Sequence, residues 1–341
     1  MESNDLNTML SVSKYHKDVL YPALVEQKTW HISLNNIPGK CQPYVRRMIG
    51  VTSLDLIEAY PDITHIDFHN LFNDVPNFGS FKKITHLNFG VQFNQIVDFK
   101  NLPSLLSISL GYKFDREIDL NGAKNMKNIY FSYSFNNTII NIPQSVVGIQ
   151  YGKKFNRMLS YKNLKNLRRI EFGNDFNTSV DGVFPDGIVH IIFGKNFNQP
   201  VDVRNLKHLQ YLTFGRHFNM GETNQRLVLP ESLNILRFGY HFNSPLDLIK
   251  CTHLKEIHFG YSFNQPLILE QNTYLNKMNF GPCFNQTLNL HKNECLEVIN
   301  IKNIKKGLVL PTDFTLKLLW YRSNKFDNVN MEQINHIQNH T

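Results

Sequence analysis

The chain has 341 residues, a hydrophobic fraction of 42%, a charged fraction of 19% and a formal net charge of +8. This composition is typical of a folded protein and argues against intrinsic disorder. No apolar run approaches the ~18 residues of a membrane-spanning helix, which excludes a membrane-embedded class. The polar start Met1–Asp5 has no signal-peptide pattern, and the four cysteines form no CxxC pair. We therefore expect an intracellular, cytoplasmic protein with no membrane partner.

Residues 1–35 differ from everything after them. Apolar residues between positions 6 and 32 recur at mixed spacings of three and four, with an interruption near Pro22. This pattern predicts one or two short amphipathic helices.

Between Trp30 and Ala59 the pattern is looser. Alternation of apolar and polar residues at Trp30–Leu34 and Val51–Leu56 predicts two strands, with a Pro38-Gly39 turn between them. We interpret residues 36–59 as degenerate first repeats.

Residues 60–290 repeat one phrase about every 21 residues, and the clearest copy runs from Leu254 to Leu267. One step is widened, to 24 residues between Phe214 and Phe238, and one is shortened, to 20 residues between Phe131 and Tyr151. Such a period is the signature of a solenoid, in which stacked units bury a continuous core. The eleven copies have their first aromatic position at Phe68, Phe89, Leu110, Phe131, Tyr151, Phe172, Phe193, Phe214, Phe238, Phe259 and Phe280.

Each repeat is expected to form a short strand, a tight turn and a return stretch. The spacing Ile257-x-Phe259 has the two-residue period of a strand, and the Gly after it breaks the strand. Stacking then produces a parallel strand ladder. The Gly, present in nine copies, permits the positive φ of a sharp corner.

Two further positions of the repeat are nearly invariant along the chain. A second Phe lies four residues after the first aromatic in all eleven copies, and Asn follows it in ten. We expect the second Phe to form an internal aromatic spine. We expect the Asn to satisfy turn backbone groups in its own or the adjacent repeat.

The segment Phe-Gly-x-x-Phe-Asn-Gln-Pro is complete at Phe193–Pro200 and Phe259–Pro266. It resembles the FNIP repeat, a divergent leucine-rich repeat known mainly from social amoebae and giant DNA viruses of amoebae. The resemblance covers roughly residues 60–290. It implies a mainly β, leucine-rich-repeat-like solenoid, whose parallel strands line a concave face that binds other proteins.

The helical segment at the N-terminus is open to two interpretations. One is a short helical cap that covers the first repeat. The other starts from Leu10, Val12 and Lys14, followed by Trp30, which together resemble the later part of an F-box. The Leu-Pro opening and first helix of that family have no counterpart before Leu6. An F-box implies docking on the adaptor of a cullin-RING ubiquitin ligase, here through residues 6–32.

The outward positions of the strands are the candidate binding surface. Residues three and one places before the first aromatic point away from the core and form two columns that vary freely in type. Tyr, Arg and His, which suit interface anchors, gather in the middle copies. We expect a protein partner to contact the concave face at Tyr130, Arg169, His190, Tyr211, Arg237 and His258.

Catalysis and cofactors have no support in the sequence. There is no HExxH, no Cys/His cluster and no glycine-rich phosphate loop. His65, His86 and His190 share one column, but other residues occupy it in the repeats between His86 and His190. We expect a non-enzymatic protein without a metal or other cofactor.

The net charge of +8 leaves nucleic-acid binding as an alternative function. Lys and Arg are scattered, and the densest group, from Lys302 to Lys325, is interpreted as a solvated face. The repeat signal fades after Phe284. We interpret residues 291–341 as degenerate terminal repeats and a C-terminal cap.

Overall fold

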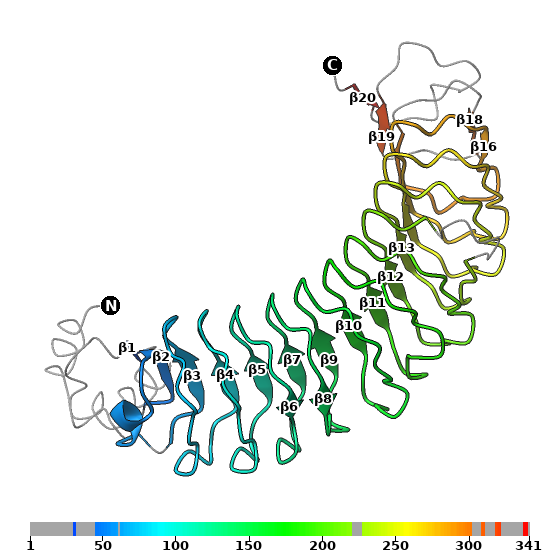
Figure 1. Ribbon diagram of the computed structural model, residues 1–341. Coiled ribbons are helices and arrows are strands. Elements are labelled where there is room, and N and C mark those ends of the chain that lie inside the picture. Colours follow the sequence, from blue (N-terminus) through cyan, green and yellow to red (C-terminus); the bar gives the residue numbers. More distant parts are fainter. Residues whose placement is uncertain are drawn as a thin grey trace, which may run out of the picture. The chain divides into compact units, whose positions relative to one another are not determined.

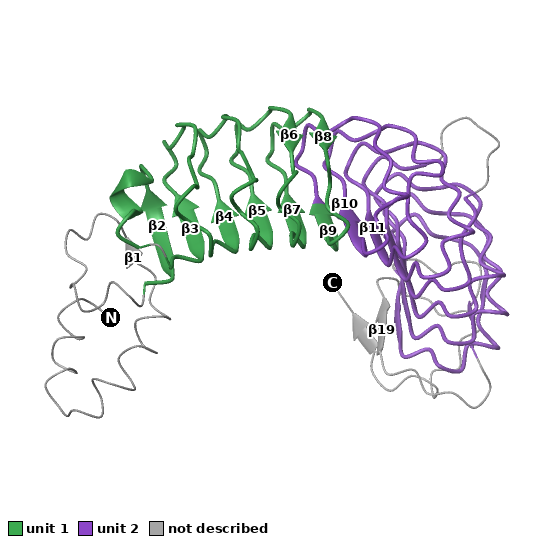
Figure 2. Cartoon of the chain, turned by 90° about the horizontal axis from the view of Figure 1, so that it is seen from below, with its two compact units in different colours: residues 1–149 green, residues 150–341 purple. Residues whose placement is uncertain are grey.

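The computed structural model describes residues 30–31, 45–60, 62–219, 227–301, 308–310, 318–321 and 337–339. The chain divides into two compact units, residues 1–149 and 150–341 (Figure 2). In each unit a short strand is followed by a turn and a return stretch that leads to the next strand (Figure 1). Both units are therefore parallel β-solenoids, as the repeat predicts.

The first unit contains a main ladder with one strand per repeat and a small second sheet. Strands β6 (Ile118–Asp119) and β8 (Ile139–Ile140) pair in the second sheet, on the return stretches. A 3₁₀ turn, η3 (Asp55–Ile57), follows the second strand. The main ladder contains, in order, β1 (Trp30–His31), β2 (Arg47–Val51), β3 (His65–Phe68), β4 (His86–Asn88), β5 (Ser107–Ser109), β7 (Asn128–Tyr130) and β9 (Gly148–Gln150), whose last residue belongs to the second unit.

The second unit is built in the same way. Strands β16 (Leu288–Asn289) and β18 (Leu308–Val309) form its small sheet. Its main ladder contains, in order, β10 (Arg169–Glu171), β11 (His190–Ile192), β12 (Tyr211–Thr213), β13 (Ile235–Arg237), β14 (Glu256–His258), β15 (Lys277–Asn279), β17 (Val298–Asn300), β19 (Leu318–Tyr321) and β20 (Ile337–Asn339).

Neighbouring strands pair in parallel at equal positions of the repeat. In the first unit His65 lies opposite His86, and in the second Arg169, His190 and Tyr211 follow one another. In the three-residue strands of the main ladder from β4 to β17, the middle residue is buried and its two neighbours are partly or fully exposed. The repeat thus places like positions in columns, and the predicted strand ladder is confirmed.

The second Phe of each repeat forms a buried spine. Phe197, Phe218, Phe242 and Phe263 are fully buried, and successive ring centroids are 6.0, 6.0 and 5.8 Å apart. Each ring also stacks on the first aromatic of its own repeat, as Phe193 does on Phe197 at 3.9 Å. The expected aromatic spine is confirmed.

The Asn after the second Phe joins one repeat to the next. Asn177 Oδ1 accepts a hydrogen bond from the backbone N–H of Asn198 at 2.8 Å, and Asn198 Oδ1 accepts one from Asn219 at 2.8 Å. Asp115 takes the same role toward Asn136, since a carboxylate oxygen also accepts. The side chains therefore satisfy turn backbone groups of the adjacent repeat, as expected.

The glycine of the Phe-Gly pair has a different role from the one expected. Among the described residues, φ is positive at Asn141, Gly50, Gly122 and Gly182, none of which follows the first aromatic. A Cβ on Gly194 would lie 2.8 Å from Asn174 Cα and closer still to the Gly173 carbonyl group. The expectation of a positive φ is therefore wrong, and the glycine is needed because successive backbones approach too closely for a side chain.

The N-terminal expectations have mixed outcomes. The strand expected at Val51–Leu56 is found earlier, at Arg47–Val51, and residues 55–57 form η3 instead. β1 lies within the expected Trp30–Leu34. The helical cap expected in residues 1–35 falls, apart from the backbone of Trp30 and His31, outside the described residues.

Candidate functional site

The outward side chains of strands β10–β15 form what we term the strand face of the second unit. They occupy the first and third positions of each three-residue strand, because the middle position faces the core. In-register pairing stacks the first positions in one column and the third positions in another. The strand face is therefore a regular array of partly exposed side chains.

Five of the six residues predicted to bind a partner lie on this strand face. Arg169, His190 and Tyr211 occupy the first position of three successive strands, and the His190 and Tyr211 rings stack at 4.1 Å with planes 5° apart. Arg237 and His258 are paired at the third position of β13 and β14. Tyr130, 42% exposed, lies on β7 in the first unit.

Glutamates neutralise much of the positive charge on the strand face. Arg169 Nη2 lies 2.9 Å from Glu171 Oε2, and Arg237 Nη2 lies 3.6 Å from Glu256 Oε2. His258 Nε2 lies 3.1 Å from the same Glu256 oxygen. The sequence analysis did not include Glu171 and Glu256 in the candidate site, although both lie in the outward columns. An opposite charge at an adjacent column position could have identified them.

The histidines of the strand face are held neutral. Asn279 Nδ2 donates to His258 Nδ1 at 2.6 Å, which leaves Nε2 to carry the proton toward Glu256. Burial lowers the pKa of His258, whereas the hydrogen bond that His258 donates to Glu256 raises it. Burial and then the Arg169 guanidinium lower the pKa of His190. Neutral His190 is therefore a flat, weakly polar surface beside Tyr211.

A pair of stacked histidines lies in the first unit. The rings of His65 and His86 are 4.2 Å apart with planes 5° apart. Each Nδ1 lies within 2.9 Å of the preceding threonine hydroxyl, and Thr64 Oγ1 itself donates to the Arg46 carbonyl. The stack explains why two histidines share this column, since flat rings pack well between strands in register.

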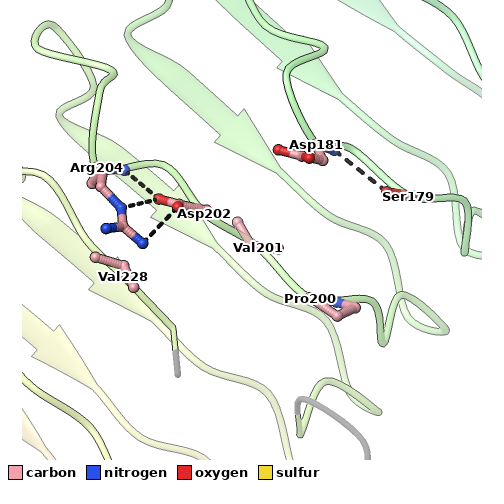
Figure 3. A pocket seen from close by; sticks show the side chains of 7 residues that line it. All are labelled: Ser179, Asp181, Pro200, Val201, Asp202, Arg204 and Val228. Carbon is pink, nitrogen blue, oxygen red and sulfur yellow. Dashed lines mark hydrogen bonds and ion pairs between the residues drawn. The ribbon is translucent and has the colours of Figure 1, made fainter. Parts of the chain in front are cut away.

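A hollow of about 600 Å³ lies on the return stretches of the second unit (Figure 3). Arg204 holds Asp202 by two contacts, 2.9 Å from Nε to Oδ1 and 2.8 Å from Nη2 to Oδ2. Asp181 donates its backbone N–H to Ser179 Oγ at 3.5 Å. The described residues that line it are Ser179, Asp181, Pro200, Val201, Asp202, Arg204 and Val228, and no His, Cys or Lys is among them.

Other expected features fall partly outside the structure. Leu10, Val12 and Lys14 lie outside the described residues, and Trp30 is described only by its backbone in β1. Within the described ranges, no group of three His, Cys, Asp or Glu side chains is placed to hold a metal ion. The same part of the chain contains no helix long and apolar enough to cross a membrane.

Comparisons with known proteins agree with this architecture. Residues 178–217 match the family described as FNIP Repeat. No curated protein matches the sequence. Among solved structures, CroV588, described as a novel circular LRR protein, is similar with 25% identity and a TM-score of 0.70 over 92% of this chain and 48% of that chain. The present chain thus spans about half the length of CroV588.

Two bacterial structures show the same fold at lower similarity. The functional domain of InlJ from Listeria monocytogenes has 14% identity and a TM-score of 0.51, covering 85% of this chain and 67% of that one. The internalin InlF from Listeria monocytogenes has 13% identity and a TM-score of 0.51, and the match covers 93% of this chain and 90% of that one. The ladder, the Phe-Asn repeat and these similarities together identify an FNIP- and leucine-rich-repeat-like repeat protein.

Proposed function

We propose that this chain is a non-catalytic interaction scaffold that binds a protein partner on its strand face. The carrying observation is the stacked His190–Tyr211 pair, which presents flat, partly exposed rings from two adjacent strands. Aromatic side chains already held in place lose little conformational freedom when a partner covers them. Arg169 adds a charged group beside the pair, itself oriented by Glu171.

Photo-crosslinking tests the strand face directly. A benzoylphenylalanine placed at Tyr211 should give a discrete protein adduct in amoebal lysate. The same group at Lys207, an exposed residue of the return stretch that leads into β12, serves as the matched control and should give no adduct. Tyr211→Ala and His190→Ala should then reduce capture of the adduct protein, while Lys207→Ala leaves it unchanged. Equal adducts from both positions would contradict binding through the strand face.

The resemblance of residues 6–32 to part of an F-box supports a second contact, with the adaptor of a cullin-RING ubiquitin ligase in the cytoplasm. In this role the solenoid presents a bound protein for ubiquitination. The test is co-purification of the purified adaptor with the full chain, with a Leu10→Glu, Val12→Glu variant and with a chain lacking residues 1–35. Binding by the full chain, without binding by either of the two altered chains, supports the role. Absence of binding by the full chain excludes it.

The strand face does not support nucleic-acid binding, the alternative suggested by the net charge. Arg169 and Arg237 both face glutamates there, which weakens attraction for phosphates. We therefore expect no retention of duplex or single-stranded nucleic acid by the chain at physiological salt. Tight binding under that condition would favour the alternative.

A further inference from the structure

The turns that follow the Phe-Gly pairs carry an exposed basic and aromatic row in the second unit. We term this row the turn edge and define it by the two positions after Gly in four successive repeats. Two of the eight positions hold Asn and Ser, and none holds Asp or Glu. The other six, all exposed, are Lys195, Arg216, His217, Tyr240, His241 and Tyr261.

The flat groups of the turn edge are stacked on one another. The Arg216 guanidinium lies over the Tyr240 ring, 4.9 Å from its centroid. Tyr240 stacks on Tyr261 at 4.6 Å, and His217 stacks on His241 at 5.1 Å. Stacking fixes the plane of the guanidinium, so its N–H edge is oriented before any ligand arrives.

The positive charge of the turn edge is not neutralised within the described residues. Neither Lys195 nor Arg216 forms an ion pair there, in contrast to the arginines of the strand face. The acidic residue of the preceding repeat, Asp175, accepts a hydrogen bond from Asn196 Nδ2 at 3.2 Å. Partial desolvation lowers the pKa of His217, and the neighbouring His241, Lys195 and Arg216 lower it further. The groups that affect this imidazole thus include no carboxylate.

The spacing of the repeats along this edge suits an extended peptide. The spine rings beneath it are 6.0, 6.0 and 5.8 Å apart from Phe197 to Phe263. Two residues of an extended chain span ~6.6 Å, so every second side chain of such a peptide meets the next repeat. The stacked groups of the edge itself are 4.6 to 5.1 Å apart from one repeat to the next, so the mismatch with the peptide is ~0.6–2 Å per repeat. Lys195 and Arg216 lie in adjacent repeats, and their flexible side chains can take up this difference.

We propose that the turn edge binds an extended acidic segment of the protein partner, with carboxylates at alternate positions. Arg216 contacts one carboxylate through two parallel N–H groups, Lys195 contacts a second, and His217 takes up a proton as the segment binds. This assignment rests on the proposed function, because it takes the ligand to be part of a protein.

The stacking also distinguishes a peptide from a nucleic acid. Single-stranded nucleic acids bind aromatic residues through the open faces of their rings. Arg216 and Tyr261 cover both faces of Tyr240, and His217 and His241 cover one face of each other. At Tyr240 both ring faces are thus covered, and the hydroxyl of this ring and the N–H groups of Arg216 remain for a ligand, which suits a carboxylate better than a base.

The experiment measures binding of fluorescein-labelled peptides to the full chain by fluorescence polarisation at low ionic strength. The probe is a peptide in which Glu and Ser alternate, and the controls are its Gln-for-Glu counterpart and an oligothymidine of equal charge. Arg216→Ala is the test variant. Lys207→Ala removes an exposed cation elsewhere in the same unit, and Tyr211→Ala alters the strand face. Thermal unfolding of each variant checks that the fold is intact.

We expect the Glu peptide to bind, the Gln peptide not to bind, and Arg216→Ala to weaken affinity by about tenfold or more. Lys207→Ala and Tyr211→Ala should change it less than about twofold. Affinity should rise as pH falls from about 7.5 to 6, and His217→Gln should reduce that rise.

Three results would overturn the assignment. These are no binding of the Glu peptide, equal losses in Arg216→Ala and Lys207→Ala, or tighter binding of the oligothymidine. Crosslinking from Tyr211 is unaffected by any of them, so failure here remains distinguishable from failure of the scaffold function.

Discussion

Replacing Gly194 by Ala adds one methyl group at a place where the backbones of two repeats are in close approach. The new Cβ would lie 2.8 Å from Asn174 Cα and nearer still to the Gly173 carbonyl. Carbon atoms in ordinary contact are ~3.5–4.0 Å apart, so the two repeats must separate by about 1 Å. All the atoms in the way belong to backbone, so no side-chain rotation relieves the clash.

The expected loss of stability follows from the hydrogen bonds that such a separation breaks. Three hydrogen bonds of 2.8 Å join the two repeats beside Gly194: Phe172 N to Ile192 O, Asn196 N to Asn174 O, and Asn198 N to Asn177 Oδ1. Lengthening each by about 1 Å puts it beyond hydrogen-bond range. At about 1 kcal/mol each, their loss destabilises the fold by about 3 kcal/mol, the upper part of the usual range for overpacking.

Urea unfolding followed by far-UV circular dichroism measures the change in the free energy of unfolding. Gly79→Ala is the control, because its Cβ would meet only the Asn77 side-chain oxygen at 3.3 Å. Ser132 occupies the equivalent position of one repeat in the first unit, where its hydroxyl donates to the Phe114 carbonyl. If Gly194→Ala and Gly79→Ala lowered stability equally, close backbone approach would not be the reason for the glycine column.

Three other perturbations test the remaining interactions. Phe218 is a fully buried ring stacked between Phe197 and Phe242. Phe218→Ala should lower the free energy of unfolding by about 3–5 kcal/mol in the same urea assay. A loss below about 1 kcal/mol would show that the spine does not stabilise the fold. Asn198→Ala should lower the free energy of unfolding by about 1–2 kcal/mol, because it removes the acceptor for the backbone N–H of Asn219. Asn198→Asp should leave stability nearly unchanged, because Asp115 takes the same role toward Asn136. A larger loss in Asn198→Asp than in Asn198→Ala would contradict this role of the Asn side chain. Burial first, then other cations, lower the pKa of both His65 and His86, so the unfolded chain binds protons more readily and stability should fall as pH drops from about 6.5. His86→Gln should reduce that fall between about pH 7 and 5.5, and an unchanged pH dependence would rule out this pair as a cause.

The periodic elements were predictable because each depends on residue type at a fixed offset. Ile257 between two outward residues predicted a strand, and β14 is found there with Ile257 buried. The second Phe predicted a spine because eleven identical large side chains at one register have to stack, as Phe197 and Phe218 do. The start of the ladder was placed less well, since the alternation at Val51–Leu56 competes with that at Arg47–Val51, and only pairing with β3 distinguishes them.

The glycine column shows where such reasoning reached the right residue for the wrong reason. A single Gly after a strand suggests a positive φ, whereas Gly194 is required by the Gly173 carbonyl of the repeat before it. The distance between two backbones is a property of the stacked pair. No pattern within one repeat contains it.

The amino-acid sequence alone determined that this protein is a parallel solenoid, which positions face inward, and which side chains share a column. These properties depend on the local residue pattern, and the same pattern recurs in every copy of the repeat. Only the tertiary structure decided which charges are neutralised. Glu256 reaches both Arg237 and His258, while Arg216 lies on Tyr240 without a carboxylate in the described residues. Such pairings depend on side-chain directions between adjacent repeats, and those directions are set by packing rather than by spacing along the chain.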